Sequence, residues 1–190
     1  MLTELFQIYL SPESEAREQL PELATTFRDF VELENATLAS AEAERYWEDK
    51  LSDLNVTVLP RLEGAIEPPQ ATTRGIWKSS FDSTLVDGLK AAAQTAGVPL
   101  KSVLLAAHMR VLSLMTGQTD ITTGVVTNGR PEEAGGESVL GLFLNTLPFR
   151  VSLNGGTWIE LARQIFETER EILPHRRYPL AALQRMHGNQ

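Results

Sequence analysis

Residues 139–150 read VLGLFLNTLPFR, and this stretch decides how the C-terminal half of the 190-residue chain is interpreted. A strand is predicted over 144–153. Gly141 has no side chain, so we expect another segment to come close to the backbone just before that strand. Pro148 has no N–H to donate to a sheet, so it is expected at an edge or at a bulge. The stretch therefore predicts a strand that another segment approaches closely at Gly141, and whose hydrogen bonding to neighbouring strands is limited at Pro148.

Helices and strands are predicted on both sides of this stretch. Asp82 is placed to cap a helix that Gly97 ends, and Thr157 is placed to cap a longer helix that Pro174 stops. Strands separated by helices without strict alternation favour an α/β (α+β) layered fold. The predicted elements are a strand over 75–81, helices over 83–96 and 99–116, a strand over 121–127, a helix over 158–173 and a short helix after Pro179.

The first third of the chain is helical in its pattern. Helices are predicted over 2–10, 20–33 and 41–54, with Ser40 as the N-cap of the third. No capping residue precedes Met1, so the first helix is interpreted as one cut from something longer. Residues 56–73 contain three prolines and a glycine and are expected to form a linker.

Composition and charge exclude several classes of function. The chain has no cysteine, which excludes disulfides and thiolate chemistry. The formal net charge is −8, and residues 1–60 hold 13 of the 25 acidic residues, so nucleic-acid binding is not expected. No stretch approaches the roughly 20 uninterrupted apolar residues of a membrane span. We expect a cytoplasmic protein that binds neither nucleic acid nor membrane.

Three histidines are the candidates for general acid–base chemistry. His108 lies within a predicted helix and is expected to be a half-buried packing residue. His175 is followed by two arginines, which favour a neutral imidazole ring or a carboxylate partner. His187, close to the C-terminus, is expected in solvent. No two histidines have the spacing of metal ligands, so no metal site is predicted.

Five stretches in order resemble motifs of one protein family. Residues 139–150 closely resemble the motif (I/V)GxFVNTLPxR of non-ribosomal peptide synthetase condensation domains. The stretch 119–131 is similar to the family's DVxxGxxxxGRP, and residues 175–180 to its HQDYPFE with two arginines substituted. Residues 27–30 match part of YxDFAxW, and residues 46–51 match YWxxxL. The chain therefore resembles the C-terminal portion of a condensation domain.

The resemblance implies a fold and a domain organisation. Condensation domains are V-shaped pairs of chloramphenicol-acetyltransferase-like lobes. We therefore expect residues 1–55 to be the helical end of the first lobe, 56–73 to be the inter-lobe linker and 74–190 to be an incomplete second lobe with a mixed sheet flanked by helices. The family's catalytic HHxxxDG is absent from the sequence and is expected just before Met1. Its last motif, RDxSRNPL, is absent too.

The resemblance also implies a reaction. Two carrier proteins present acyl groups on 4'-phosphopantetheine arms, and the acceptor amine attacks the donor thioester to give an amide. An adenylation domain is expected nearby in the same synthetase, together with the missing first-lobe segment. The chain alone is expected to be inactive because it has no HHxxxDG.

The residues expected at the site follow from the same resemblance. Asn145, Thr146 and Gly141 are expected to line the substrate tunnel. An asparagine that holds a turn at the strand edge is an equal alternative for Asn145. Four further residues are expected to be structural or to contact phosphopantetheine, and bridging between loops is the favoured role for the two arginines among them. These four are Arg130, Arg150, His175 and Tyr178.

Two other functions stay open. A free-standing acyltransferase of the same superfamily would need His108 or His175 as its catalytic residue. A non-catalytic module would bind carrier proteins or complete another chain in trans. An incomplete lobe should also expose an apolar patch or an unpaired strand edge, so the chain is expected to self-associate.

Overall fold

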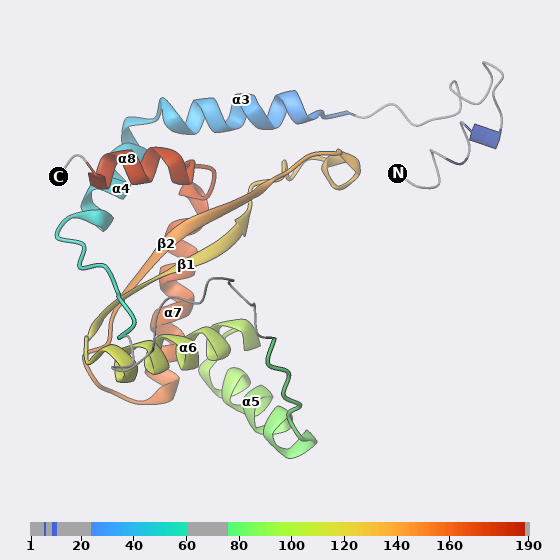
Figure 1. Cartoon of the computed structure of the whole chain (residues 1–190). Coiled ribbons are helices and arrows are strands. Elements are labelled where there is room, and N and C mark those ends of the chain that lie inside the picture. Colours follow the sequence, from blue (N-terminus) through green and yellow to red (C-terminus); the bar gives the residue numbers. More distant parts are fainter. Residues whose placement is uncertain (1–5, 7–8, 11–23, 61–75, 189–190) are drawn as a thin grey trace, which may run out of the picture.

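A computed structural model describes residues 6, 9–10, 24–60 and 76–188 of the chain. Of the predicted helix over 2–10, only residues 6, 9 and 10 are described, and all three are helical. Most of the predicted linker lies outside the described residues. A long antiparallel pair of strands runs through the middle of the structure, with α7 along it (Figure 1). In the view of Figure 1, α3, α4 and α8 lie above this pair, and α5 and α6 lie below it.

The elements have the following bounds. The helices are α3 (Phe27–Leu38), α4 (Ala41–Leu51), α5 (Ser83–Ala96), α6 (Leu100–Thr116), α7 (Trp158–Ile172) and α8 (Leu180–Gly188). The strands are β1 (Asp120–Asn128) and β2 (Leu144–Ser152), and two short 3-10 turns are η1 (Gly136–Ser138) and η2 (Leu173–His175).

Most predicted helix ends are confirmed. Asp82 accepts the N–H of Leu85 at 2.8 Å, and Thr157 is the N-cap of α7 in a capping box. Gly97 and Gly117 end α5 and α6 in the left-handed conformation, with φ of 69° and 71°. Only glycine adopts that conformation without steric cost, so these two positions set the helix lengths.

Two helix predictions were wrong at their boundaries. The helix predicted over 20–33 begins at Phe27 and continues to Leu38. A capping box between Thr26 and Asp29 sets its start, and helical periodicity alone does not detect that local signal. The helix predicted over 41–54 ends at Leu51, because Asp53 takes a φ of 51° and turns the chain away.

The predicted strand over 75–81 is also wrong for the residues that are described. Residues 76–81 form no strand, and Ile76 and Trp77 are 82% and 93% exposed. A β-prone sequence becomes a strand only when a neighbouring backbone accepts its hydrogen bonds, and no described residue does so here. The sheet of the described residues is antiparallel with two strands, so the parallel pairs of a mixed sheet are not among them.

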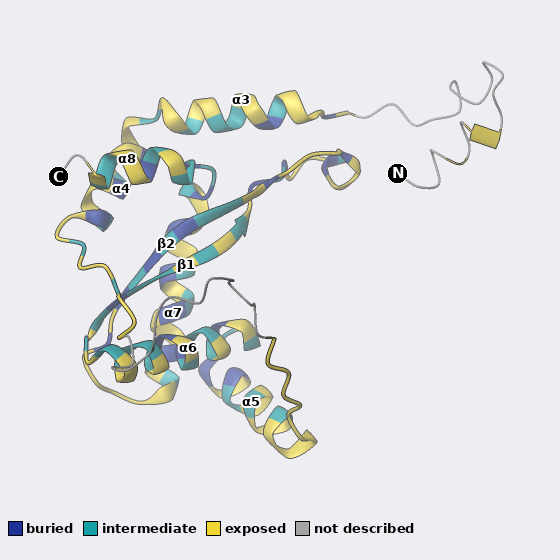
Figure 2. Ribbon diagram, in the orientation of Figure 1, coloured by how far each residue is buried: buried dark blue, intermediate teal, exposed yellow. Residues whose placement is uncertain are grey.

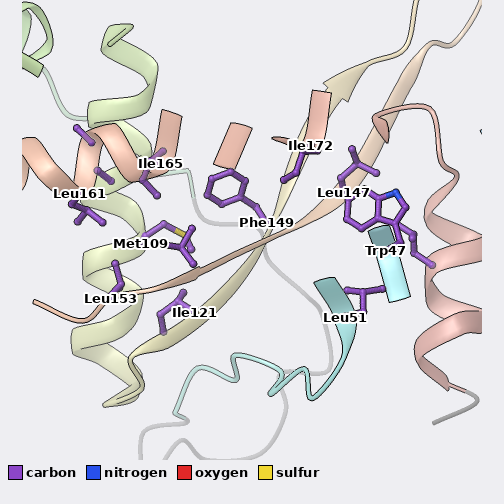
Figure 3. Close-up of a cluster of buried hydrophobic side chains, with 14 of the residues drawn as sticks. Trp47, Leu51, Met109, Ile121, Leu147, Phe149, Leu153, Leu161, Ile165 and Ile172 are labelled. Carbon is purple, nitrogen blue, oxygen red and sulfur yellow. The ribbon is translucent and has the colours of Figure 1, made fainter. Parts of the chain in front are cut away.

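The sheet has a precise register and one buried face. Gly124 pairs with Pro148 in the ladder between β1 and β2. β2 has no second partner among the described residues, so the predicted edge position of Pro148 is confirmed. The buried face packs against α6 and α7 and continues into α4 and α8 (Figure 3). Side chains with 0% exposure in this core are Trp47, Met109, Ile121 and Ile165.

The described residues thus confirm the α/β (α+β) class, with helices packed on a small sheet. No single helix among them is long and apolar enough to cross a membrane. The pair α5 and α6 meets the length and hydropathy required only when taken together, and it is bent by 101°.

The part of the molecule formed by α5 and α6 has many exposed residues, drawn in yellow in Figure 2, and several of their side chains are apolar. They belong to α5, α6 and the segment before them, where the polar surface typical of a monomer is interrupted. They are Ile76, Trp77, Phe81, Leu85, Leu104, Val111, Leu114 and Met115.

We expect the 21.0-kDa chain to self-associate through this surface, because burying exposed apolar area is favourable. Light scattering should give a mean mass that rises with concentration, and the double substitution Leu104→Lys with Leu114→Lys should lower it. Gln94→Lys with Gln184→Lys adds the same charge at exposed polar positions and should leave the association unchanged. A monomer at every concentration contradicts this expectation.

Candidate functional site

Asn145, near the start of β2, holds the loop that leads into α8. Its side-chain amide donates to the backbone carbonyls of Arg176 at 3.0 Å and Tyr178 at 2.7 Å. Its oxygen accepts the N–H of Leu180 at 3.3 Å. Both amide hydrogens and the carbonyl oxygen are therefore engaged within the chain. This geometry matches the holding role considered for Asn145, whereas its place in a tunnel stays a prediction.

Thr146 follows Asn145 in the strand and points to the other face of the sheet, since successive side chains alternate. Its methyl group packs against Gly124 of β1, where an added Cβ would lie 3.0 Å away. Asn145 and Thr146 therefore cannot both direct their side chains into one tunnel from the same face.

The loop before α8 is fixed a second time by Arg176. This side chain is 9% exposed and donates to the carbonyls of Asn128 at 3.2 Å and Leu173 at 2.9 Å. It also forms an ion pair with Glu132 at 2.6 Å. The arginine thus joins the end of β1, the end of α7 and the loop between the strands.

Arg177 and Arg130 extend this network along the loop between the strands. Arg177 donates to the carbonyls of Gly129 at 2.8 Å and Arg130 at 3.3 Å. Arg130 in turn donates to the carbonyls of Gly136 at 2.8 Å and Val139 at 2.6 Å. The bridging role expected for Arg130 is therefore seen, and its contact with phosphopantetheine stays a prediction.

Aromatic packing attaches α3 to the same loop. Phe27 and Phe30 lie 5.5 and 5.0 Å from the ring of Phe143, edge to face, and the guanidinium of Arg130 lies 4.0 Å above that ring. A Cβ at Gly141 would overlap the Phe27 ring, so the close approach predicted at Gly141 is confirmed. Two stretches that resembled family motifs thus contact each other.

Arg150 bridges β2 and the end of α4. Its guanidinium contacts the Asp120 carboxylate at 2.6–3.1 Å and donates to the carbonyls of Lys50, Ser52 and Asp53 at 2.7–3.2 Å. A guanidinium has five N–H groups, and these bonds use all five. The bridging role is therefore seen, and no donor is left for a phosphate group in this conformation.

His175 lies against α4 with its ring stacked on Tyr46, at 4.1 Å between centroids. Burial lowers the pKa of His175, and the nearby Glu42 opposes this shift in part. The neutral ring expected from the sequence is therefore favoured. Burial also raises the pKa of Tyr46 to about 12 and raises the pKa of Tyr178, whose side chain is buried.

The other two histidines differ from expectation. His108 is exposed on α6 rather than half-buried, because its helix face has no described segment packed on it. His187 is partly buried in α8, and its Nδ1 has no hydrogen-bond partner among the described residues. Within the described ranges, no group of three histidine, aspartate or glutamate side chains could hold a metal ion.

A cavity of about 240 Å³ that sequence reasoning missed lies between β1 and the end of α7. Val125, Phe149 and Ile172 form apolar walls, and Lys101 pairs with Glu169 at 2.9 Å at its border. Glu169 also accepts the hydroxyl of the buried Ser102 at 2.6 Å. Ser102 and Glu169 are 67 positions apart in the sequence, so no local pattern could indicate that they contact each other.

The chain belongs to the condensation-domain family, because the family model for the condensation domain matches residues 1–190. The chain is 42% identical to the AMB antimetabolite synthetase AmbE of Pseudomonas aeruginosa over 162 residues, 85% of this chain. It is 31% identical to gramicidin S synthase 2 of Brevibacillus brevis over 193 residues, 97% of this chain.

The fold agrees with solved condensation domains. The first condensation domain of the calcium-dependent antibiotic synthetase superposes with a TM-score of 0.68 at 22% identity, over 98% of this chain. The chain covers 43% of that structure, and it spans 7% of AmbE and 4% of gramicidin S synthase 2. The chain therefore has the condensation-domain fold and corresponds to a small part of these longer relatives.

We expect Asn145→Asp to destabilise the chain by about 1–3 kcal/mol at neutral pH, because a carboxylate would face two carbonyl oxygens. Repulsion should raise the pKa of the new carboxyl, so the loss should shrink as the pH falls and a donor hydrogen returns. Urea unfolding at several pH values measures this effect. Asn154→Asp in an exposed loop is the control, and equal losses in both variants would contradict the holding role of Asn145.

A second prediction concerns His175. Its pKa is lower in the folded chain than the ordinary 6.5, so the unfolded state binds more protons below that pH. The contribution of the neutral His175 ring to the free energy of unfolding should therefore be fully present above about pH 6.5. It should be lost progressively as the pH falls below that value. His175→Phe keeps the ring stack and should flatten this dependence, whereas His108→Gln should not. An unchanged pH profile in His175→Phe would exclude His175 as its source.

Proposed function

We propose that this chain supplies the second-lobe wall of a condensation domain that forms amide bonds in non-ribosomal peptide synthesis. The observation that carries the proposal is the position of Asn145. This residue lies in the NTLPFR stretch and joins that stretch to the HRRYPL loop through three hydrogen bonds. Both stretches lie in a chain whose whole length matches the condensation-domain family.

The reaction joins two acyl groups held as 4'-phosphopantetheine thioesters on carrier proteins. The amine nitrogen of the acceptor attacks the donor's thioester carbon, and the C–N bond replaces the C–S bond. The amine loses a proton, and the donor arm leaves as a thiol. Holding both tethered groups in line accounts for a large part of such a rate, up to roughly 7–11 kcal/mol in well-oriented systems.

The residues of this chain hold the second-lobe wall in place, and a residue outside this chain transfers the proton. The amide of Asn145 is occupied by the loop before α8, so it keeps the strand and loop in register. Thr146 lies on the opposite face of β2, which we assign as the side toward the substrate. The base is assigned to the HHxxxDG histidine of the segment that precedes this stretch in condensation domains.

The geometry of the histidines disfavours a free-standing acyltransferase. The ring of His175 stacks on Tyr46, and His108 is exposed on α6. Neither residue lines the cavity between β1 and α7. The exposed apolar residues of α5 and α6 instead favour completion by further polypeptide, so complementation in trans is retained as the second candidate.

We expect the purified 190-residue chain to form no amide from carrier-bound donor and acceptor, because it has no HHxxxDG. Adding a polypeptide that carries the HHxxxDG segment of the same synthetase should restore product, measured by mass spectrometry of the released arms. The same polypeptide with the second histidine changed to alanine is the matched control. Product from the chain alone would sink the proposal, and stable binding without product would favour the non-catalytic module.

A further inference from the structure

The end of α4 is held by a side chain from β2. A helix leaves its last carbonyl groups without intrahelical partners, and a cation near that end is favourable. Arg150 donates to the carbonyl of Lys50 in α4 and to those of Ser52 and Asp53 just beyond it, at 2.7–3.2 Å. These residues are 97–100 positions away in the chain, so the contact is purely tertiary.

Asp120 orients this guanidinium. Its carboxylate contacts Nε and Nη2 of Arg150 at 2.6–3.1 Å, and the side chains of Arg150 and Asp120 are 22% and 31% exposed. A two-pronged pair of this kind fixes the plane of the guanidinium, which a single point contact does not. The remaining N–H groups are thereby aimed at the end of α4. The hydrogen bonds to Asp120 also raise the pKa of Arg150.

The segment after α4 is attached to β1 as well. Asp53 is the one non-glycine residue with positive φ among the described residues, and the chain turns there. Thr57 then accepts the N–H of Thr122 at 2.8 Å through its hydroxyl. The N–H of Leu54 closes the turn on the carbonyl of Leu51 at 3.2 Å. The segment after α4 is therefore attached to the strands at two points, through Arg150 of β2 and through Thr122 of β1.

β2 is consequently fixed at both of its ends. Arg150 ties one end to α4, and Asn145 ties the other end to the loop before α8. We propose that Arg150 and Asp120 clamp α4 to the sheet, and that Arg150 is thereby a positioning residue for the wall formed by Asn145 and Thr146. The clamp itself follows from the contacts alone, whereas its effect on the reaction rests on the proposed function.

Hydrogen exchange tests the clamp in the 190-residue chain. Arg150→Lys keeps the charge, but one ammonium group cannot reach Asp120 and three carbonyls together. We expect faster exchange of the Leu54 and Thr122 amides by about tenfold or more, with the amide of Leu161 in α7 unchanged. Arg170→Lys is the matched control, because Arg170 makes an exposed pair with Glu167.

Unchanged exchange at Leu54 and Thr122 in Arg150→Lys would overturn the clamp. An equal rise at Leu161 would overturn it too, because it would indicate a general loss of stability. Asp120→Asn provides a second variant that should raise exchange at the same two amides without altering Arg150.

Kinetics of the synthetase that carries this chain test the positioning role. Arg150→Lys should lower kcat for amide formation by roughly 10- to 100-fold and leave KM for the carrier proteins unchanged. Arg170→Lys should change neither constant. Faster exchange with an unchanged kcat would overturn the positioning role. A wild-type synthetase that forms no amide would overturn the proposed function instead, and the exchange data would still decide the clamp.

Discussion

Backbone carbonyls in the irregular segments, and at the ends of the elements beside them, impose the main constraint on this structure. The loop between the strands and the loop before α8 carry carbonyl groups that no ladder satisfies, and leaving such groups unpaired is costly. Side chains satisfy them instead. Asn145 binds two, Arg176 binds two, Arg130 binds two, and Arg177 binds two more. These side-chain bonds attach the irregular segments to the rest of the chain.

This arrangement explains why the motif residues are so close together in space. The arginines of the NGRP and HRRYPL stretches donate to backbone carbonyls, and the aromatic contact of Phe143 with Phe27 fixes α3 beside them. The contacts of these residues thus lie within the chain and join its irregular segments to one another.

Much of the fold could be predicted from local chemistry. The caps at Asp82 and Thr157, the left-handed glycines and the proline on an edge strand act within a few residues, so the sequence displays them directly. The strand expected over 75–81 failed because pairing depends on a partner far away in the chain. Boundaries at Phe27 and Leu51 were missed because a capping box and one left-handed residue overrode the apolar pattern.

For the candidate site, too, the sequence indicated some residues but not the contacts that they make. Resemblance to family motifs located Asn145, Gly141 and Arg150, but the hydrogen-bond partners of Asn145 and Arg150 are side chains and carbonyls 30 or more positions away. No local signal indicates that Asp120 and the carbonyls at the end of α4 are the partners of Arg150, so only the structure shows that all five of its donors are occupied.

A crystal structure of the complete condensation domain with an acceptor thioester mimic tests the central claim most directly. We predict that the amide of Asn145 keeps its bonds to Arg176, Tyr178 and Leu180 while the mimic lies along the Thr146 side of β2. A mimic hydrogen-bonded to the Asn145 amide, with those three bonds broken, would show that Asn145 binds substrate rather than holding the wall.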